Sequence, residues 1–142
     1  MFHLILPLRI EFLAQGVDTL LDINDLLGKP YKAHGRGPNG YDCYGLVIEV
    51  EKRLGRELPD LYKIFDKKSE VKNLTISTEV VGLKKTKTPV FGDIVVFKKN
   101  GRADHIAVYL KNDDFIHCDG NGVRVMNLNY YNKKGEFYTW LQ

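Results

Sequence analysis

The sequence predicts an α+β domain in which helices come first and an antiparallel sheet follows. The first half holds a stretch with apolar residues at helical spacing, over 43–54. The second half holds short apolar runs separated by turn residues, over 94–140, which is the pattern of an antiparallel meander. The chain has 142 residues, of which 44% are hydrophobic and 27% charged, which suits a single folded domain and argues against wholesale disorder.

Residues 1–21 fit this pattern poorly, so we treat them as an N-terminal extension and assign residues 22–142 to the domain. The extension could be an additional element, could come from an upstream start codon, or could cover the cleft of the domain. Its apolar run is interrupted by Pro7, Arg9 and Glu11 and has no basic residue before it, so we expect no secretion signal and synthesis in the cytoplasm. No apolar run approaches the ~18 residues that a membrane-spanning helix needs.

The N-terminal part of the domain is expected to hold two helices. The first is short, over 22–28, and ends at a glycine before a glycine-rich loop over 32–40. For the second, Asp42 is a good N-cap, which places Cys43 at the first position of a helix that runs to Leu54 and stops at the next glycine. The apolar residues of this helix share one face, which predicts that the face is buried: Cys43, Leu46, Val47, Val50 and Leu54.

Residues 56–88 carry a weaker pattern. Leu61, Ile64 and Phe65 suggest another short helix, and the lysine-rich stretch 84–87 favours a solvated loop. The strands of the sheet are then expected over 94–97, 103–110, 115–118, 123–126 and 137–140.

Of the two cysteines, Cys43 has the surroundings of a reactive thiol. At a helix N-terminus, the helix dipole and the unpaired N–H groups stabilise a thiolate over a thiol. The glycine-rich loop before it allows the backbone to approach a ligand closely. The alternative is that Cys43 is simply a small residue on a buried helix face.

Two histidines lie on neighbouring expected strands, His105 and His117. Their even separation places them on the same face of the sheet if the loop between the strands is odd in length, whereas a two-residue loop would separate them. On one face, one imidazole could take the proton of a thiol while the other orients the first. The alternative for each histidine alone is an ordinary strand residue with satisfied hydrogen bonds.

Four segments resemble the NlpC-type cysteine peptidases in order, spacing and residue type, and together they extend over residues 22–128. They are Pro30-Tyr31 with the loop and 40–47 (Gly-Tyr-Asp-Cys-Tyr-Gly-Leu-Val), 91–97 (Phe-Gly-Asp-Ile-Val-Val-Phe), 104–109 (Asp-His-Ile-Ala-Val-Tyr) and 115–117 (Phe-Ile-His). The resemblance implies a papain-like fold. It also implies hydrolysis of an amide bond in bacterial peptidoglycan, typically between γ-D-glutamate and a diamino acid.

The resemblance also implies roles for single residues. Cys43 corresponds to the nucleophile, His105 to the general base and later acid, and His117 to the residue that orients the base. The backbone N–H of Cys43 is a plausible oxyanion donor. The implied reaction, acylation of the thiol and hydrolysis of the thioester by water, needs no metal and no cofactor.

Three residues near the nucleophile are expected to line the oxyanion or substrate site: Tyr31, Asp42 and Tyr44. Tyr31 matches the family's tyrosine before the nucleophile loop. Tyr44 departs from the family pattern, because most cell-wall members carry serine directly after the cysteine. An aromatic residue followed by Gly-Leu-Val resembles the branch found in phage and prophage tail proteins, which implies tail proteins as partners and delivery to the cell wall by a tail particle.

The alternatives concern other chemistries. A zinc site could draw on His34, Cys43, His105, His117 and Cys118, but paired ligand spacings are missing. The adjacent His117 and Cys118 are expected to point to opposite faces of a strand, which gives Cys118 a packing role.

Other functions stay open as well. The net charge of +3 and the separated lysine pairs favour solvated loops over a nucleic-acid surface. Tyr130 and Tyr131 could line a cleft or cover the edge of the sheet. A structural tail component with a retained hydrolase fold, a CHAP-type amidase and an acyltransferase are the remaining candidates.

Overall fold

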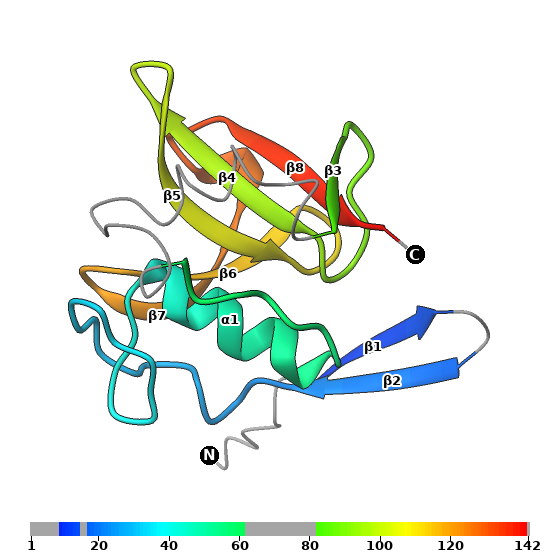
Figure 1. Cartoon of the computed structure of the whole chain (residues 1–142), viewed down its shortest axis with the longest axis horizontal. Helices are drawn as coiled ribbons and strands as arrows, with labels where there is room; N and C mark the ends of the chain where they lie inside the picture. The colour runs from blue at the N-terminus through cyan, green and yellow to red at the C-terminus, as the bar shows by residue number, and fades with distance from the viewer. Residues whose placement is uncertain (1–8, 15–16, 62–81, 142) are drawn as a thin grey trace, which may run out of the picture.

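The computed structural model describes residues 9–14, 17–61 and 82–141. In these residues a helix, α1 (Cys43–Arg53), packs on a six-stranded antiparallel sheet, as Figure 1 shows. The expected α+β architecture is therefore confirmed, with the helix preceding the strands of the sheet in the chain.

The sheet has the spatial order β3-β8-β4-β5-β6-β7. Its strands are β3 (Leu83–Thr86), β4 (Ile94–Lys99), β5 (Arg102–Tyr109), β6 (Asp114–Asp119), β7 (Gly122–Asn127) and β8 (Gly135–Trp140). Each neighbouring pair is antiparallel. The five strands expected from the sequence are all present, with ends that differ by two residues or fewer.

The bounds of α1 agree with its expected caps. The Asp42 side chain accepts a hydrogen bond of 2.6 Å from the Gly45 N–H, which satisfies one of the unpaired donors of the first turn. Leu54 caps the other end, and Gly55 follows with φ of +79°, a conformation that glycine adopts without strain.

The hydrophobic core divides into two clusters, one on each face of the sheet. The larger lies between α1 and the sheet and includes Leu46, Val47 and Val50 of the helix. The smaller consists of Val95, Phe97, Ala107, Tyr109 and Phe115. Because successive residues of a strand point to opposite faces, the strands near the site contribute to both clusters.

Two sequence expectations about local structure are wrong. The expected helix over 22–28 is absent: Asp22 ends β2 and residues 24–28 form turns, from which the Gly28 N–H donates to the Val123 carbonyl at 2.9 Å. The stretch 84–87 is not a loop, since most of it belongs to β3, where pairing with β8 outweighs the polar composition. The expected helix around Ile64 and Phe65 falls outside the described residues.

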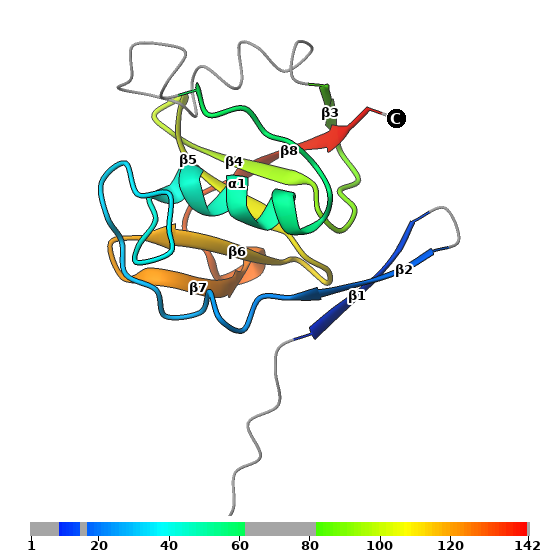
Figure 2. The same cartoon turned by 60° about the horizontal axis from the view of Figure 1, so that its bottom comes forward.

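The N-terminal extension contains a hairpin of β1 (Arg9–Ala14) and β2 (Val17–Asp22), which forms a sheet of its own. Figures 1 and 2 both show it beside the C-terminal end of α1. The described strands of the extension therefore lie away from the helix end that carries Cys43. Leu21, at the end of β2, belongs to the larger core cluster.

Candidate active site

The nucleophile segment is built from the loop before α1 and the first turn of the helix. Cys43 is the first residue of α1 and is partly buried against the larger core cluster. A Cβ at Gly45 would collide with the Gly35 carbonyl oxygen, so glycine is required where the loop crosses the helix. This close approach fixes the loop against the helix end, where a thiolate is electrostatically favoured.

His105 on β5 and His117 on β6 are in direct contact. His105 Nε2 and His117 Nδ1 lie 2.7 Å apart and form a buried hydrogen bond. The paired residues Tyr109 and Phe115 enclose an odd number of residues, 110–114, which places both histidines on one face of the sheet. The structure therefore places the two histidines on the same face of the sheet, as their even spacing in the sequence allows.

Aromatic rings surround the histidine pair. Phe97 stacks on His105 with ring centroids 5.8 Å apart, and the edges of Phe115 and Tyr131 meet His117. Burial lowers the pKa of both imidazoles below the usual value, and in His105 the neighbouring His117 lowers it further. Both rings are therefore neutral at neutral pH, as a base that must accept a proton requires.

The hydrogen bond limits the tautomers of the pair. If His105 Nδ1 is to accept a proton, His105 Nε2 carries a hydrogen and donates it to His117 Nδ1. The other nitrogen of His117, Nε2, is buried and has no hydrogen-bond partner among the described residues. The side chain of His117 is 0% exposed, and within the described part of the chain its hydrogen bond is the one with His105.

The helix α1 packs on β5 and β6, the strands that carry the two histidines, and a hydrogen bond links the chain before the helix to β6. The Cys118 thiol on β6 donates a hydrogen bond of 3.1 Å to the Tyr41 carbonyl, which docks the chain just before Cys43 against the strand that carries His117.

Cys118 itself is buried in the larger cluster, on the face opposite His117. Burial raises the pKa of its thiol to about 11, which keeps it protonated. The packing role expected for Cys118 agrees with this position. Among the described residues, no group of three or more His, Cys, Asp or Glu side chains is placed to hold a metal ion.

Of the three residues expected to line the site, the structure leaves Tyr31 accessible, with 46% of its surface exposed, and joins its backbone to that of Tyr41. Asp42 is nearly buried, and its side chain caps the helix. For Tyr44 the expectation of a substrate-lining side chain is corrected: it is only 1% exposed, and its hydroxyl donates to the Pro59 carbonyl at 2.8 Å. A side chain without exposed surface does not contact a ligand that arrives from solvent.

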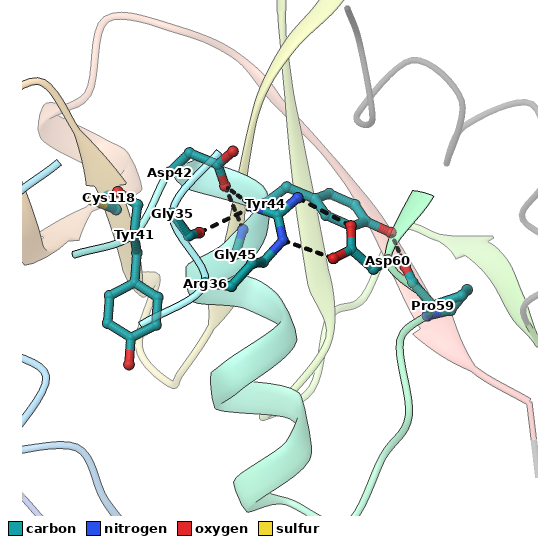
Figure 3. A network of polar contacts seen from close by, with 9 residues as sticks. All are labelled: Gly35, Arg36, Tyr41, Asp42, Tyr44, Gly45, Pro59, Asp60 and Cys118. Atoms are coloured by element: carbon teal, nitrogen blue, oxygen red, sulfur yellow. Dashed lines mark hydrogen bonds and ion pairs between the residues drawn. The ribbon is translucent and has the colours of Figure 1, made fainter. Parts of the chain in front are cut away.

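The sequence reasoning missed the residues that hold these groups in place. Arg36, in the glycine-rich loop, bonds Asp42 and Asp60, and Figure 3 shows the guanidinium between the two carboxylates. For Tyr131 the sequence predicts only that it and Tyr130 line a cleft or cover the edge of the sheet, and not that its ring contacts His117. The neighbouring Tyr130 is exposed, whereas the ring of Tyr131 contacts His117, so the two tyrosines do not have the same environment.

A depression lies beside this network. It has a volume of about 340 Å³ and does not include Cys43, His105 or His117. Its lining residues are Asp25, Lys29, Arg36, Gly37, Pro38, Tyr41, Glu49 and Arg53.

A thiol at the N-terminus of a helix that packs on the two strands carrying a buried imidazole pair is typical of papain-like cysteine hydrolases. Residues 28–139 match the NlpC/P60 family, and the chain belongs to this family. Of the helices in the described part of the chain, none combines the length and apolarity that crossing a membrane requires.

Relatives with curated names agree with the family. The chain is 28% identical over 110 residues to the probable peptidoglycan endopeptidase LytE of Bacillus subtilis, an alignment covering 76% of this chain and 28% of LytE. It is 32% identical over 111 residues to the murein DD-endopeptidase MepH of Escherichia coli, covering 70% of this chain and 34% of MepH. The chain thus spans about a third of these relatives or less.

The fold has solved counterparts. The NlpC2 structure from Trichomonas vaginalis superposes with a TM-score of 0.60 at 22% identity, covering 82% of this chain and 43% of that one. The NlpC/p60 domain of the peptidoglycan hydrolase SagA gives a TM-score of 0.53 at 23% identity, covering 77% and 86%. These likenesses show that the fold is shared.

Proposed function

We propose that this chain is a cysteine hydrolase that cleaves an amide bond in the stem peptides of bacterial peptidoglycan, between γ-D-glutamate and a diamino acid. The observation that carries the proposal is the buried 2.7 Å contact between His105 and His117, next to a helix that presents Cys43 at its N-terminus. The names of LytE and MepH, a peptidoglycan and a murein endopeptidase, support the substrate class.

In the proposed mechanism, His105 takes the proton of the Cys43 thiol, and the sulfur attacks the carbonyl carbon of the scissile amide. The negative charge on the carbonyl oxygen is stabilised by the backbone N–H of Cys43 and by the hydroxyl of Tyr31. His105 then returns the proton to the departing amine. Water, activated by the same imidazole, hydrolyses the thioester and regenerates the thiol.

The surroundings of the imidazoles fit this cycle. Burial among aromatic rings keeps His105 neutral and able to accept a proton. Once protonated, His105 donates to His117 Nδ1 through a charge-assisted hydrogen bond, which is stronger than the neutral one. The pair therefore stabilises the state in which the thiol has lost its proton.

The test is digestion of purified peptidoglycan by the wild-type chain and by Cys43→Ala, followed by masses of the products. Cys118→Ala is the matched control, because it removes the other thiol, which is buried. We expect new termini at the γ-D-glutamyl bond from wild type and Cys118→Ala but not from Cys43→Ala. Cleavage at the D-alanyl bond instead, as the name of MepH describes, would correct the bond. Equal digestion by Cys43→Ala would refute the hydrolase.

We also propose that the protein acts within a phage or prophage tail particle that delivers it to the cell wall. Support comes from the segment Cys43–Val47, in which an aromatic residue follows the cysteine. Mass spectrometry of purified particles should find the chain together with tail proteins. Its absence from particles would contradict the proposal. A purely structural tail role would instead show a Cys43 that reacts with iodoacetamide no faster than an ordinary thiol.

A further inference from the structure

Arg36 connects three separate parts of the chain at the helix end that carries Cys43. Its Nε and Nη2 donate to the two carboxylate oxygens of Asp60 at 3.0 and 3.1 Å, a bidentate ion pair. Its Nη1 donates to Asp42 Oδ1 at 2.8 Å and to the Gly35 carbonyl at 3.0 Å. Figure 3 shows these bonds converging on one guanidinium beside the first turn of α1.

The bond to Asp42 involves the same oxygen that caps the helix. Asp42 Oδ1 also accepts the 2.6 Å bond from the Gly45 N–H, so the guanidinium and the helix N-terminus share one acceptor. Arg36 is partly buried, and charge-assisted bonds in such a setting are stronger and more directional than exposed ones. The geometry of the cap therefore depends on the position of Arg36.

A second contact joins the segment that contains Asp60 to the first turn of α1. The Tyr44 hydroxyl donates to the Pro59 carbonyl, and the Arg36 guanidinium lies 6.0 Å from the centre of the Tyr44 ring. The segment containing Pro59 and Asp60 is thus fastened to the first turn of α1 from two sides. The tyrosine after the nucleophile has its function here, inside the protein, rather than against a substrate.

We infer that Arg36 is a positioning residue for the proposed nucleophile: it holds Asp42 in its capping geometry and offsets the negative charge that Asp42 and Asp60 place beside Cys43. The inference rests on the proposed role of Cys43. At neutral pH the cluster has two carboxylates and one guanidinium, and each of them acts on the charge of a thiolate at the helix end.

Substitutions of the two partners in the bidentate pair should change the stability of the Cys43 thiolate in opposite directions. Arg36→Gln removes the positive charge that neutralises the carboxylates of Asp42 and Asp60, and the remaining negative charge disfavours the Cys43 thiolate. Asp60→Asn removes one negative charge and leaves Arg36 balanced by Asp42, which favours the thiolate. Both variants break the same ion pair, so a purely structural role would move the two in the same direction.

The experiment measures the rate of iodoacetamide alkylation of Cys43 in the full chain as a function of pH, with the modified residue located by mass spectrometry. The midpoint should move by about half a pH unit to higher pH in Arg36→Gln and by a similar amount to lower pH in Asp60→Asn, for charges screened at an effective dielectric of roughly 20 or more. Arg36→Lys keeps the charge and should restore most of the wild-type midpoint.

The helix supplies its own controls at the other end. Arg53 makes a bidentate pair with Asp25, at 2.6 and 2.8 Å, and bonds Glu49 at 2.9 Å. Arg53→Gln and Asp25→Asn therefore break a comparable pair in the same helix, far from Cys43, and should leave the midpoint unchanged.

The other ionisable groups near the histidine pair are unaltered in all variants: Asp104, His105, His117, Asp119, Arg124, Tyr131 and Lys133. Shifts of Arg36→Gln and Asp60→Asn in the same direction, or no shift in either, would overturn the inference. If Arg36→Gln fails to fold, the direction of Asp60→Asn decides. Failure of the proposed function is separate, because it appears as peptidoglycan digestion that does not depend on Cys43.

Discussion

The buried contact between His105 and His117 predicts how activity responds to substitution of His117. His117→Asn places an amide oxygen near the position of Nδ1 and keeps an acceptor for His105 Nε2. His117→Leu removes the acceptor while leaving an apolar side chain among Phe97, Phe115 and Tyr131. The two variants therefore separate the hydrogen bond from the packing.

The expected size follows from the bond. In the transition state His105 is protonated, and a hydrogen bond to a charged group contributes about 1.5–3 kcal/mol. Since about 1.4 kcal/mol corresponds to a factor of ten in rate, His117→Leu should lower kcat by roughly 10- to 100-fold. His117→Asn should stay within about tenfold of wild type, because the neutral amide oxygen still accepts the bond.

The assay is the rate of hydrolysis of a stem peptide containing the γ-D-glutamyl bond, with the thermal midpoint of unfolding measured for each variant. The thermal midpoint identifies any loss that comes from folding rather than from chemistry. Wild-type activity in His117→Leu would refute the orienting role. Equal impairment of the Asn and Leu variants, with both folded, would show that the acceptor is not what matters.

Three further predictions concern buried groups. Cys118→Ala should leave alkylation of Cys43 and hydrolysis unchanged and cost about 1 kcal/mol in denaturant unfolding, the value of its bond to a backbone carbonyl. Tyr44→Phe should cost a similar ~1 kcal/mol with no change in KM, whereas a raised KM would return Tyr44 to the substrate site. Burial raises the pKa of Glu51 from 4.5 to about 8, although Arg56 opposes this. As pH rises, Glu51 loses its proton in the unfolded chain before it does so in the folded protein. The free energy of unfolding therefore decreases as pH rises from 4.5 to about 8. Glu51→Gln should flatten the fall in a series of thermal melts, and parallel pH profiles of the two proteins would contradict it.

Most local elements could be predicted because their signals are local. Asp42 followed by apolar residues at helical spacing predicts α1, since a cap and an amphipathic face depend only on neighbours in the sequence. Asn100-Gly101, with φ of +53° and +76°, joins β4 to β5 as the dipeptide indicates. In contrast, β3 is a strand because β8 pairs with it, and that partner is distant in the chain.

The candidate site divides in the same way. Cys43, His105 and His117 are candidates from the sequence because helix capping and strand spacing allow them to meet and because their segments resemble the family. Arg36 and Asp60 could not be paired in advance, since they lie 24 residues apart with no pattern that links them. Glu51 lies on a helix of mixed polarity, and its full burial follows only from what packs over it.

The sequence by itself determined the class of fold, because periodicity, caps and turn residues act over a few positions, and the resemblance of its segments to a family named the three candidate catalytic residues. The tertiary structure alone decided that the two imidazoles touch, that Tyr44 faces inward, and that Arg36 lies between two carboxylates at the nucleophile's helix. These contacts join segments far apart in the chain. Packing and desolvation select such contacts, and both depend on the whole fold rather than on neighbouring residues.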